Sequence, residues 1–157
     1  GNDDVAVSDL ERSNELFPTA LATNSLGNIE EKRGNKAKAI EYYGAVAGRQ
    51  GEIATEARDS LIRLDLEDNP DKYLQVGCYA DNSGYLVVAI ANATSVAIRD
   101  VRFLIQYRDN AGVTRNLEED IRGPIPAGQR ADRRTTLGPY SESAGCPVRV
   151  TSARIDD

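Results

Sequence analysis

The chain has 157 residues, of which 40% are hydrophobic and 28% charged, a composition typical of a folded globular protein rather than a disordered or fibrous one. Its 19 basic and 25 acidic side chains give a formal net charge of -6, which argues against nucleic acid as a partner, because such a ligand needs a basic surface. Histidine is absent and cysteine occurs twice, which excludes histidine-based catalysis, most catalytic zinc sites and thiolate zinc sites. From these absences we predict no catalytic residue, no metal ligand and no cofactor, and therefore a chain that is not an enzyme.

The first half of the chain predicts helices. Residues 1–75 hold 9 Lys and Arg against 15 Asp and Glu, whereas residues 76–157 are neutral and richer in Val, Ile, Thr and Arg. This change in composition predicts two domains, residues 1–70 and residues 71–157, joined near residues 67–71. Apolar residues at helical spacing predict about four short helices between residues 3 and 66, with a tight turn at Gly34-Asn35.

The second half predicts six or seven strands. Residues 86–90 form a run of five apolar, mostly branched side chains, and residues 101–108 alternate between apolar and polar with a period of two. Residues 109–112 predict a hairpin turn, because Gly112 is free to adopt a positive φ. Strands of this number and spacing fit a small antiparallel sandwich, so the predicted fold class is α+β.

Within residues 24–47, small and aromatic side chains stand at set positions: Leu26, Gly27, Gly34, Ala39 and Tyr43. With these residues the segment resembles a tetratricopeptide repeat. Small side chains at two of these positions let paired helices approach, and the aromatic ring fills the space toward the next helix. Glu30 departs from the family pattern, which usually has an apolar or aromatic residue there. The resemblance implies antiparallel helical hairpins ended by a capping helix at residues 52–66, and a generic helical hairpin is the alternative.

The same resemblance implies a protein or peptide partner. Peptides often bind the concave face of such arrays, which is lined by the first helix of each repeat. The positions of this chain that would point there are Leu21, Asn24, Asn28 and Glu31. Asn24 and Asn28 are one helical turn apart and are able to hydrogen-bond an extended peptide backbone. The alternative is that both side chains only hydrate the helix.

Four segments stand out within residues 86–137: Asn92-Ala93-Thr94, residues 101–105, residues 109–112 and Pro126-Ala127-Gly128. In these segments the chain resembles the small FxLYD-type module of bacterial envelope proteins. The motif that names the module is degraded here to residues 105–109, where only the aspartate is kept. The resemblance implies an immunoglobulin-like β-sandwich and a location in the periplasm or cell envelope of a bacterium. Residues 92–94 also match a glycosylation pattern, but a turn is the favoured interpretation.

Taken together, the two segments are similar to the C-terminal regions of periplasmic His-Glu-x-x-His metalloproteases or of envelope lipoproteins. We therefore expect a noncatalytic protein-interaction region of an envelope protein. One alternative is an accessory region of a protease whose catalytic domain lies upstream, since no His-Glu-x-x-His occurs here. Another is a structural module that forms a homodimer through the N-terminal helix, using Val5, Leu10 and Leu16. No run of about 18 apolar residues is present, so we expect no membrane span.

Cys78 lies on the first predicted strand and Cys146 just before the last. The first and last strands of a sandwich are often close, which predicts a disulfide between these two residues. An even number of cysteines without metal-type spacing agrees with an oxidising compartment, and two buried free thiols are the alternative.

Two charged clusters have mainly structural interpretations. Arg130, Arg133 and Arg134 are candidates for gripping a phosphate or carboxylate, but we expect them to cover an exposed strand face, with Asp132 among them. Residues 118–120 are three consecutive acids, which point to alternate faces of a strand and therefore do not converge on one cation.

Overall fold

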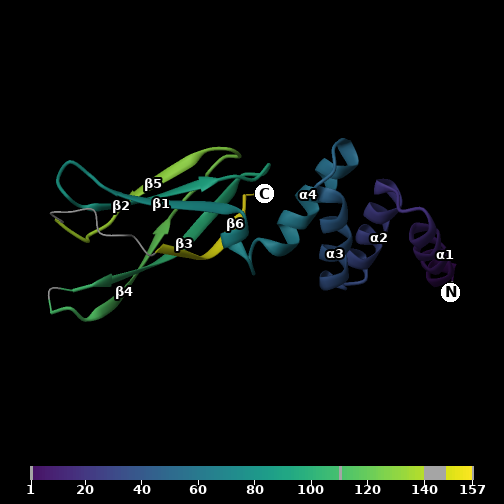
Figure 1. The fold of residues 1–157 in the computed structure, drawn as a ribbon, viewed down its shortest axis with the longest axis horizontal. Helices are drawn as coiled ribbons and strands as arrows, with labels where there is room; N and C mark the ends of the chain where they lie inside the picture. The colour runs from purple at the N-terminus through teal and green to yellow at the C-terminus, as the bar shows by residue number, and fades with distance from the viewer. Residues whose placement is uncertain (1, 110, 140–147, 157) are drawn as a thin grey trace. The chain divides into compact units, whose positions relative to one another are not determined.

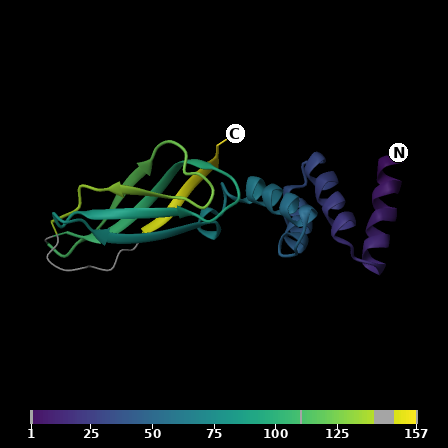
Figure 2. The same cartoon turned by 90° about the horizontal axis from the view of Figure 1, so that it is seen from above.

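The structure is a computed structural model that describes residues 2–109, 111–139 and 148–156. The chain is α+β and divides into two compact units, Gly1–Asp65 and Leu66–Asp157. Within the described residues, the first unit contains four helices and the second contains two small antiparallel sheets, as Figures 1 and 2 show.

The helices of the first unit are α1 (Asn2–Leu16), α2 (Ala20–Lys32), α3 (Lys36–Ala47) and α4 (Glu52–Asp65). Local chemistry explains where they begin and end. Pro18 follows α1, and the Thr19 hydroxyl caps α2 by accepting a hydrogen bond from the Ala22 amide at 3.1 Å. Gly34 separates α2 from α3 with φ of 79°, a left-handed conformation that favours glycine. The helical spacing and the Gly34 turn were both predictable.

The core of the first unit lies between consecutive helices. Its buried residues come from α3 and α4 and are Ala39, Tyr43, Val46, Ala54 and Ala57. Leu26 of α2 is also buried, and α2 packs more closely against α3 than against α1. In α1, Val5 and Leu16 are 62% and 68% exposed, and Leu10 is half-buried.

The second unit begins with the short helix η1 (Pro70–Lys72) and continues with strands. These are β1 (Leu74–Ala80), β2 (Leu86–Asn92), β3 (Ile98–Arg108), β4 (Thr114–Ile121), β5 (Arg130–Arg134) and β6 (Val148–Ile155). One sheet has the order β1-β2-β5 and the other β4-β3-β6, and every pairing is antiparallel. The central strands are therefore β2 and β3, and both sheets contain strands that are distant in sequence.

The core of the second unit comes from both central strands. On β3, Val101, Phe103 and Ile105 are buried, as is Ile98 at its start, and Arg102 and Leu104 between them face outward. On β2, residues 87–90 are all buried, so both faces of this strand are covered. The apolar alternation of residues 101–108 thus forms the inward face of a strand, as predicted.

The segment Asn92-Ala93-Thr94 is a turn. Asn92 is 1% exposed, and its amide nitrogen donates to the carbonyl oxygens of Val96 at 2.8 Å and Ile125 at 2.9 Å. Its Oδ1 accepts from the Thr94 amide at 3.0 Å. Because the amide nitrogen is enclosed and fully used, Asn92 is a structural residue and not a glycosylation acceptor in the folded chain.

The predicted hairpin turn joins β3 to β4. The Asp109 carboxylate accepts hydrogen bonds from the amides of Ala111 and Val113, both at 2.9 Å, and Gly112 has φ of 76°. Among the described residues, no helix is both long and apolar enough to cross a membrane.

Candidate functional site

The residues predicted to contact a peptide lie along one side of α2. Leu21 is 61% exposed, and Asn28 and Glu31 are exposed as well. Their spacing places them on successive turns of one helix face, over about 15 Å of helix length. This face therefore presents an apolar side chain, an amide and a carboxylate in a row.

The hydroxyl of Tyr43, from α3, positions two of these groups. It lies 2.6 Å from Glu31 Oε2 and 2.7 Å from Asn28 Oδ1. A hydroxyl carries one proton, so it donates to one of these oxygens at a time, and the carboxylate is the stronger acceptor. Burial, together with the hydrogen bond to Glu31, raises the pKa of Tyr43 well above its usual value, so the hydroxyl stays protonated near neutral pH.

Tyr43 also links this face to α4, because it belongs to the same buried cluster as Ala54 and Ala57 of that helix. The ring itself is completely buried, against Gly27 of α2. Sequence reasoning assigned Tyr43 to helix packing alone and missed the role of its hydroxyl. The signal that would have found it is the amphipathic character of tyrosine, whose polar tip needs a partner when the ring is buried.

Asn24 differs from the other predicted contact residues. It is only 6% exposed, and within the described part of the chain its Oδ1 has no hydrogen-bond partner. It therefore lies beneath the face that Leu21, Asn28 and Glu31 form, and it offers little surface to a ligand.

The buried Glu30 explains a departure from the repeat pattern. Its carboxylate accepts from Asn35 Nδ2 at 2.7 Å and from Arg33 Nη1 at 3.3 Å, and the Asn35 amide donates to the Glu30 carbonyl oxygen at 2.8 Å. The hydrogen bond from Asn35, the largest effect, holds the pKa of Glu30 below its usual value, aided by the nearby cations. Glu30 thus fastens the α2–α3 turn with polar contacts, where the repeat pattern has an apolar residue.

The remaining positions of the repeat resemblance are packing positions. Leu26 and Ala39 are 1% and 0% exposed. Gly34 stands in the turn that lets α3 fold back beside α2.

The three arginines of β5 are all engaged in ion pairs. Arg130 contacts both oxygens of Asp132, at 2.6 and 2.7 Å, and its guanidinium lies 5.6 Å from the centre of the Tyr79 ring. Arg134 pairs with Asp81 and lies 4.1 Å from the centre of the Tyr85 ring. These contacts join β5 to β1 and the β1–β2 loop across the β1-β2-β5 sheet, which supports a structural role for these arginines.

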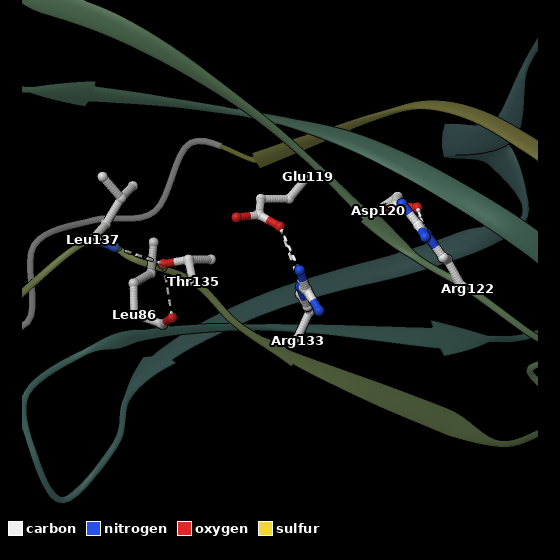
Figure 3. Close-up of polar contacts among 7 residues, drawn as sticks. All are labelled: Leu86, Glu119, Asp120, Arg122, Arg133, Thr135 and Leu137. Carbon is white, nitrogen blue, oxygen red and sulfur yellow. Dashed lines mark hydrogen bonds and ion pairs between the residues drawn. The ribbon is translucent and has the colours of Figure 1, made fainter.

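Acidic residues of β4 point to alternate faces, as Figure 3 shows for Glu119 and Asp120. Glu119 lies on the inward face, opposite Phe103, and accepts from Arg133 Nη2 at 2.9 Å. Asp120 pairs with Arg122 at 2.7 Å on the outward face. In the part of the chain that is described, no group of three or more acids or cysteines forms a metal site.

Cys78 lies on β1 and is disulfide-bonded. The other half of the predicted pair, Cys146, lies outside the described residues.

No protein-family model matches this chain, and no curated protein matches it. Among solved structures, the chain is similar to an alkylpurine DNA glycosylase of Pseudomonas fluorescens, whose structure contains DNA with an abasic-site analogue. The TM-score is 0.31 and the sequence identity 9%, and the similarity covers 98% of this chain and 52% of that one. This chain therefore spans about half the length of the protein that it matches.

The prediction that the chain is not an enzyme is corrected: the matched structure is that of an enzyme, and the absence of histidine was too narrow a ground for the prediction. The sequence argument excluded mechanisms that need histidine, and carboxylate or tyrosine chemistry does not need it. A likeness at this TM-score transfers no activity, substrate or site residue to the present chain.

Proposed function

We propose that this chain is a protein-interaction region of a bacterial cell-envelope protein, and that its helical unit binds or positions a peptide or protein partner. The observation that carries the proposal is the α2 face, where Leu21, Asn28 and Glu31 stand exposed in a row on a buried helical core. A row of about 15 Å matches four or five residues of an extended peptide. The Tyr43 hydroxyl lies within hydrogen-bond distance of both polar groups and donates to one of them at a time, which restrains them before a ligand arrives and lowers the entropy lost on binding.

The helical unit is proposed to be of the tetratricopeptide type. Supporting this, Gly27 and Ala39 lie where two helices pack closely, Gly34 stands in the turn, and Tyr43 fills the space between α2 and α4. The proposal for the second unit is an immunoglobulin-like β-sandwich of the FxLYD type, as a spacer or second contact surface. Two three-stranded antiparallel sheets with apolar inward faces support it.

An oxidising compartment, the periplasm or cell envelope, is proposed for this region. The disulfide at Cys78 supports it, because disulfides persist where the surroundings are oxidising and are rare in the bacterial cytosol.

The test is a selection of random peptides, displayed on phage, against the whole chain. Peptides that bind the α2 face should lose about tenfold or more in affinity for an Asn28→Ala/Glu31→Ala variant, because a charged hydrogen-bonding group is removed. Glu56→Ala, which removes an exposed acid from α4, is the matched control and should bind like the unaltered chain. Failure to enrich any peptide, or equal affinity for all three proteins, would overturn the proposal.

A further inference from the structure

The outward face of the β4-β3-β6 sheet carries an open cavity of about 630 Å³. Residues of all three strands line it, among them Arg102 on β3, Asp120 on β4, and Ser152 and Arg154 on β6. Arg102 stands between the buried residues Val101 and Phe103 on its strand, so it points away from the core. The cavity is therefore independent of the α2 face in the helical unit.

Most acids of the lining are already engaged. Asp120 accepts from Arg122 at 2.7 Å, a pair that Figure 3 shows, and Asp100 lies 3.3 Å from Arg99. Asp68 also has an interaction partner. The hydrogen bond from Arg122, aided by the charges of Arg133 and of Arg102 opposite it in the strand register, holds the pKa of Asp120 below its usual value.

Two guanidinium groups of the lining have room for a further partner. Within the described ranges of the chain, the side chain of neither Arg102 nor Arg154 forms a hydrogen bond or an ion pair. The same holds for a single carboxylate of the lining, Glu67. The lining as a whole carries four acids and three arginines, so it favours a ligand with few negative charges.

The strand register brings the two arginines together. Arg102 is paired with Ser152, and Arg154 is the next outward-facing residue along β6. Diagonal neighbours on one face of a sheet are about 7 to 8 Å apart, a distance that two long guanidinium side chains bridge to reach one ligand. A β-bulge interrupts the pairing between Arg99 and Arg102, and Asp100 within it has φ of 52°. Bulges of this kind re-aim the side chains beside them.

We propose that this cavity binds an oxyanion, the carboxylate or phosphate group of a small ligand, between Arg102 and Arg154, with the Ser152 hydroxyl as a further donor. Guanidinium groups present parallel N–H donors that match the two oxygens of such a group. The cavity is large enough for a small organic acid, and Glu67 sets a limit on the total negative charge that it accepts.

The experiment is a titration of the whole ¹⁵N-labelled chain with sodium succinate and, separately, with inorganic phosphate, at constant ionic strength. We expect saturable shifts of the Ser152, Ala153 and Arg154 amide signals. An Arg102→Ala/Arg154→Ala variant should bind about tenfold more weakly or worse, because it loses both charged donors. Glu67→Gln should bind about twofold or more tightly, because a repelling charge is removed.

Arg108→Ala is the matched control. Arg108 is exposed on the same face of β3 but lies outside the cavity, so its removal should leave both affinities unchanged. Saturation by succinate alone would assign the site to carboxylates, by phosphate alone to phosphates, and either result supports an oxyanion site. Linear shifts without saturation, or equal weakening by Arg108→Ala and by the double variant, would overturn the proposal. If the double variant fails to fold, Glu67→Gln decides the test instead, because weaker or unchanged binding by that variant would also overturn the proposal.

Discussion

Gly27 on α2 lies directly against the ring of Tyr43 on α3, so close that a Cβ at position 27 would come within 2.6 Å of Tyr43 Cε1. The ring has no room to retreat, because it is fully buried and its hydroxyl is held by Asn28 and Glu31. The contact makes glycine a requirement at this position of an otherwise ordinary helix.

Gly27→Ala is therefore expected to lower the free energy of unfolding by about 1 to 3 kcal/mol, because the α2–α3 interface is overpacked. Urea denaturation measures the change. Gly44→Ala on α3 is the control: apart from its chain neighbours and the backbone of its own helix, no heavy atom of the described residues lies within 4 Å of its Cβ position, so alanine should stabilise the helix by roughly 0.5 to 1 kcal/mol. Equal effects of the two substitutions would contradict the packing explanation.

Glu30 predicts a loss of stability in acid. Its pKa in the folded chain is held below the usual value of 4.5 by the hydrogen bond from Asn35 and by nearby cations. A depressed folded-state pKa stabilises the fold above the unfolded-state value, and this contribution is lost as the pH falls through the folded-state value. Urea midpoints measured between pH 6 and about pH 3 should therefore fall less steeply for Glu30→Gln than for the unaltered chain. If the urea midpoints of the two proteins fall in parallel with pH, a carboxylate other than Glu30 is responsible for the loss of stability in acid.

Asn92→Ala should destabilise the second unit by about 2 to 3 kcal/mol, since it leaves the Val96 and Ile125 carbonyl oxygens without their donor. The measurement is again denaturant unfolding. Asn116→Ala, on the exposed part of β4, is the matched change and should have little effect. If both substitutions lower the free energy of unfolding by a comparable amount, the buried amide of Asn92 has no special role.

The disulfide prediction is tested by intact mass. Cys78 is disulfide-bonded, and a bridge to Cys146 would close a loop of about 70 residues, worth roughly 4 kcal/mol in the chain-entropy model. Without reductant the chain should be two hydrogens lighter than after reduction. If both cysteines are alkylated in the unreduced, denatured protein, the two thiols are free and the pairing is wrong.

Local sequence signals predicted the elements well. The helical spacing around Tyr43, the turn glycines Gly34 and Gly112, and the alternation along β3 each depend on residues close in sequence, so they are readable without coordinates. Helix periodicity likewise placed Asn24 and Asn28 on one face. It did not show that only Asn28 is exposed, because the cover over Asn24 is a tertiary effect.

The polar contacts between distant strands were not predictable. Arg133 meets Glu119, and Arg134 meets Asp81, only because β5 pairs with β2 and lies near β4. Neither relationship follows from residue spacing, since β5 pairs with the non-consecutive strand β2 and belongs to a different sheet from β4. The same holds for the approach of Arg102 to Arg154, which depends on the register of β3 with β6 and on the bulge between them.

The inward-facing Glu119 has a consequence for solubility. It stands on the strand at the open edge of its sheet, where the backbone offers hydrogen-bonding groups to any passing chain. A foreign strand added at this edge would have to accommodate the inward-facing Glu119 and its ion pair with Arg133. Fibril growth from β4 is therefore opposed by a charge inside the fold, and a chain in which Glu119 is replaced by leucine should aggregate more readily during prolonged storage.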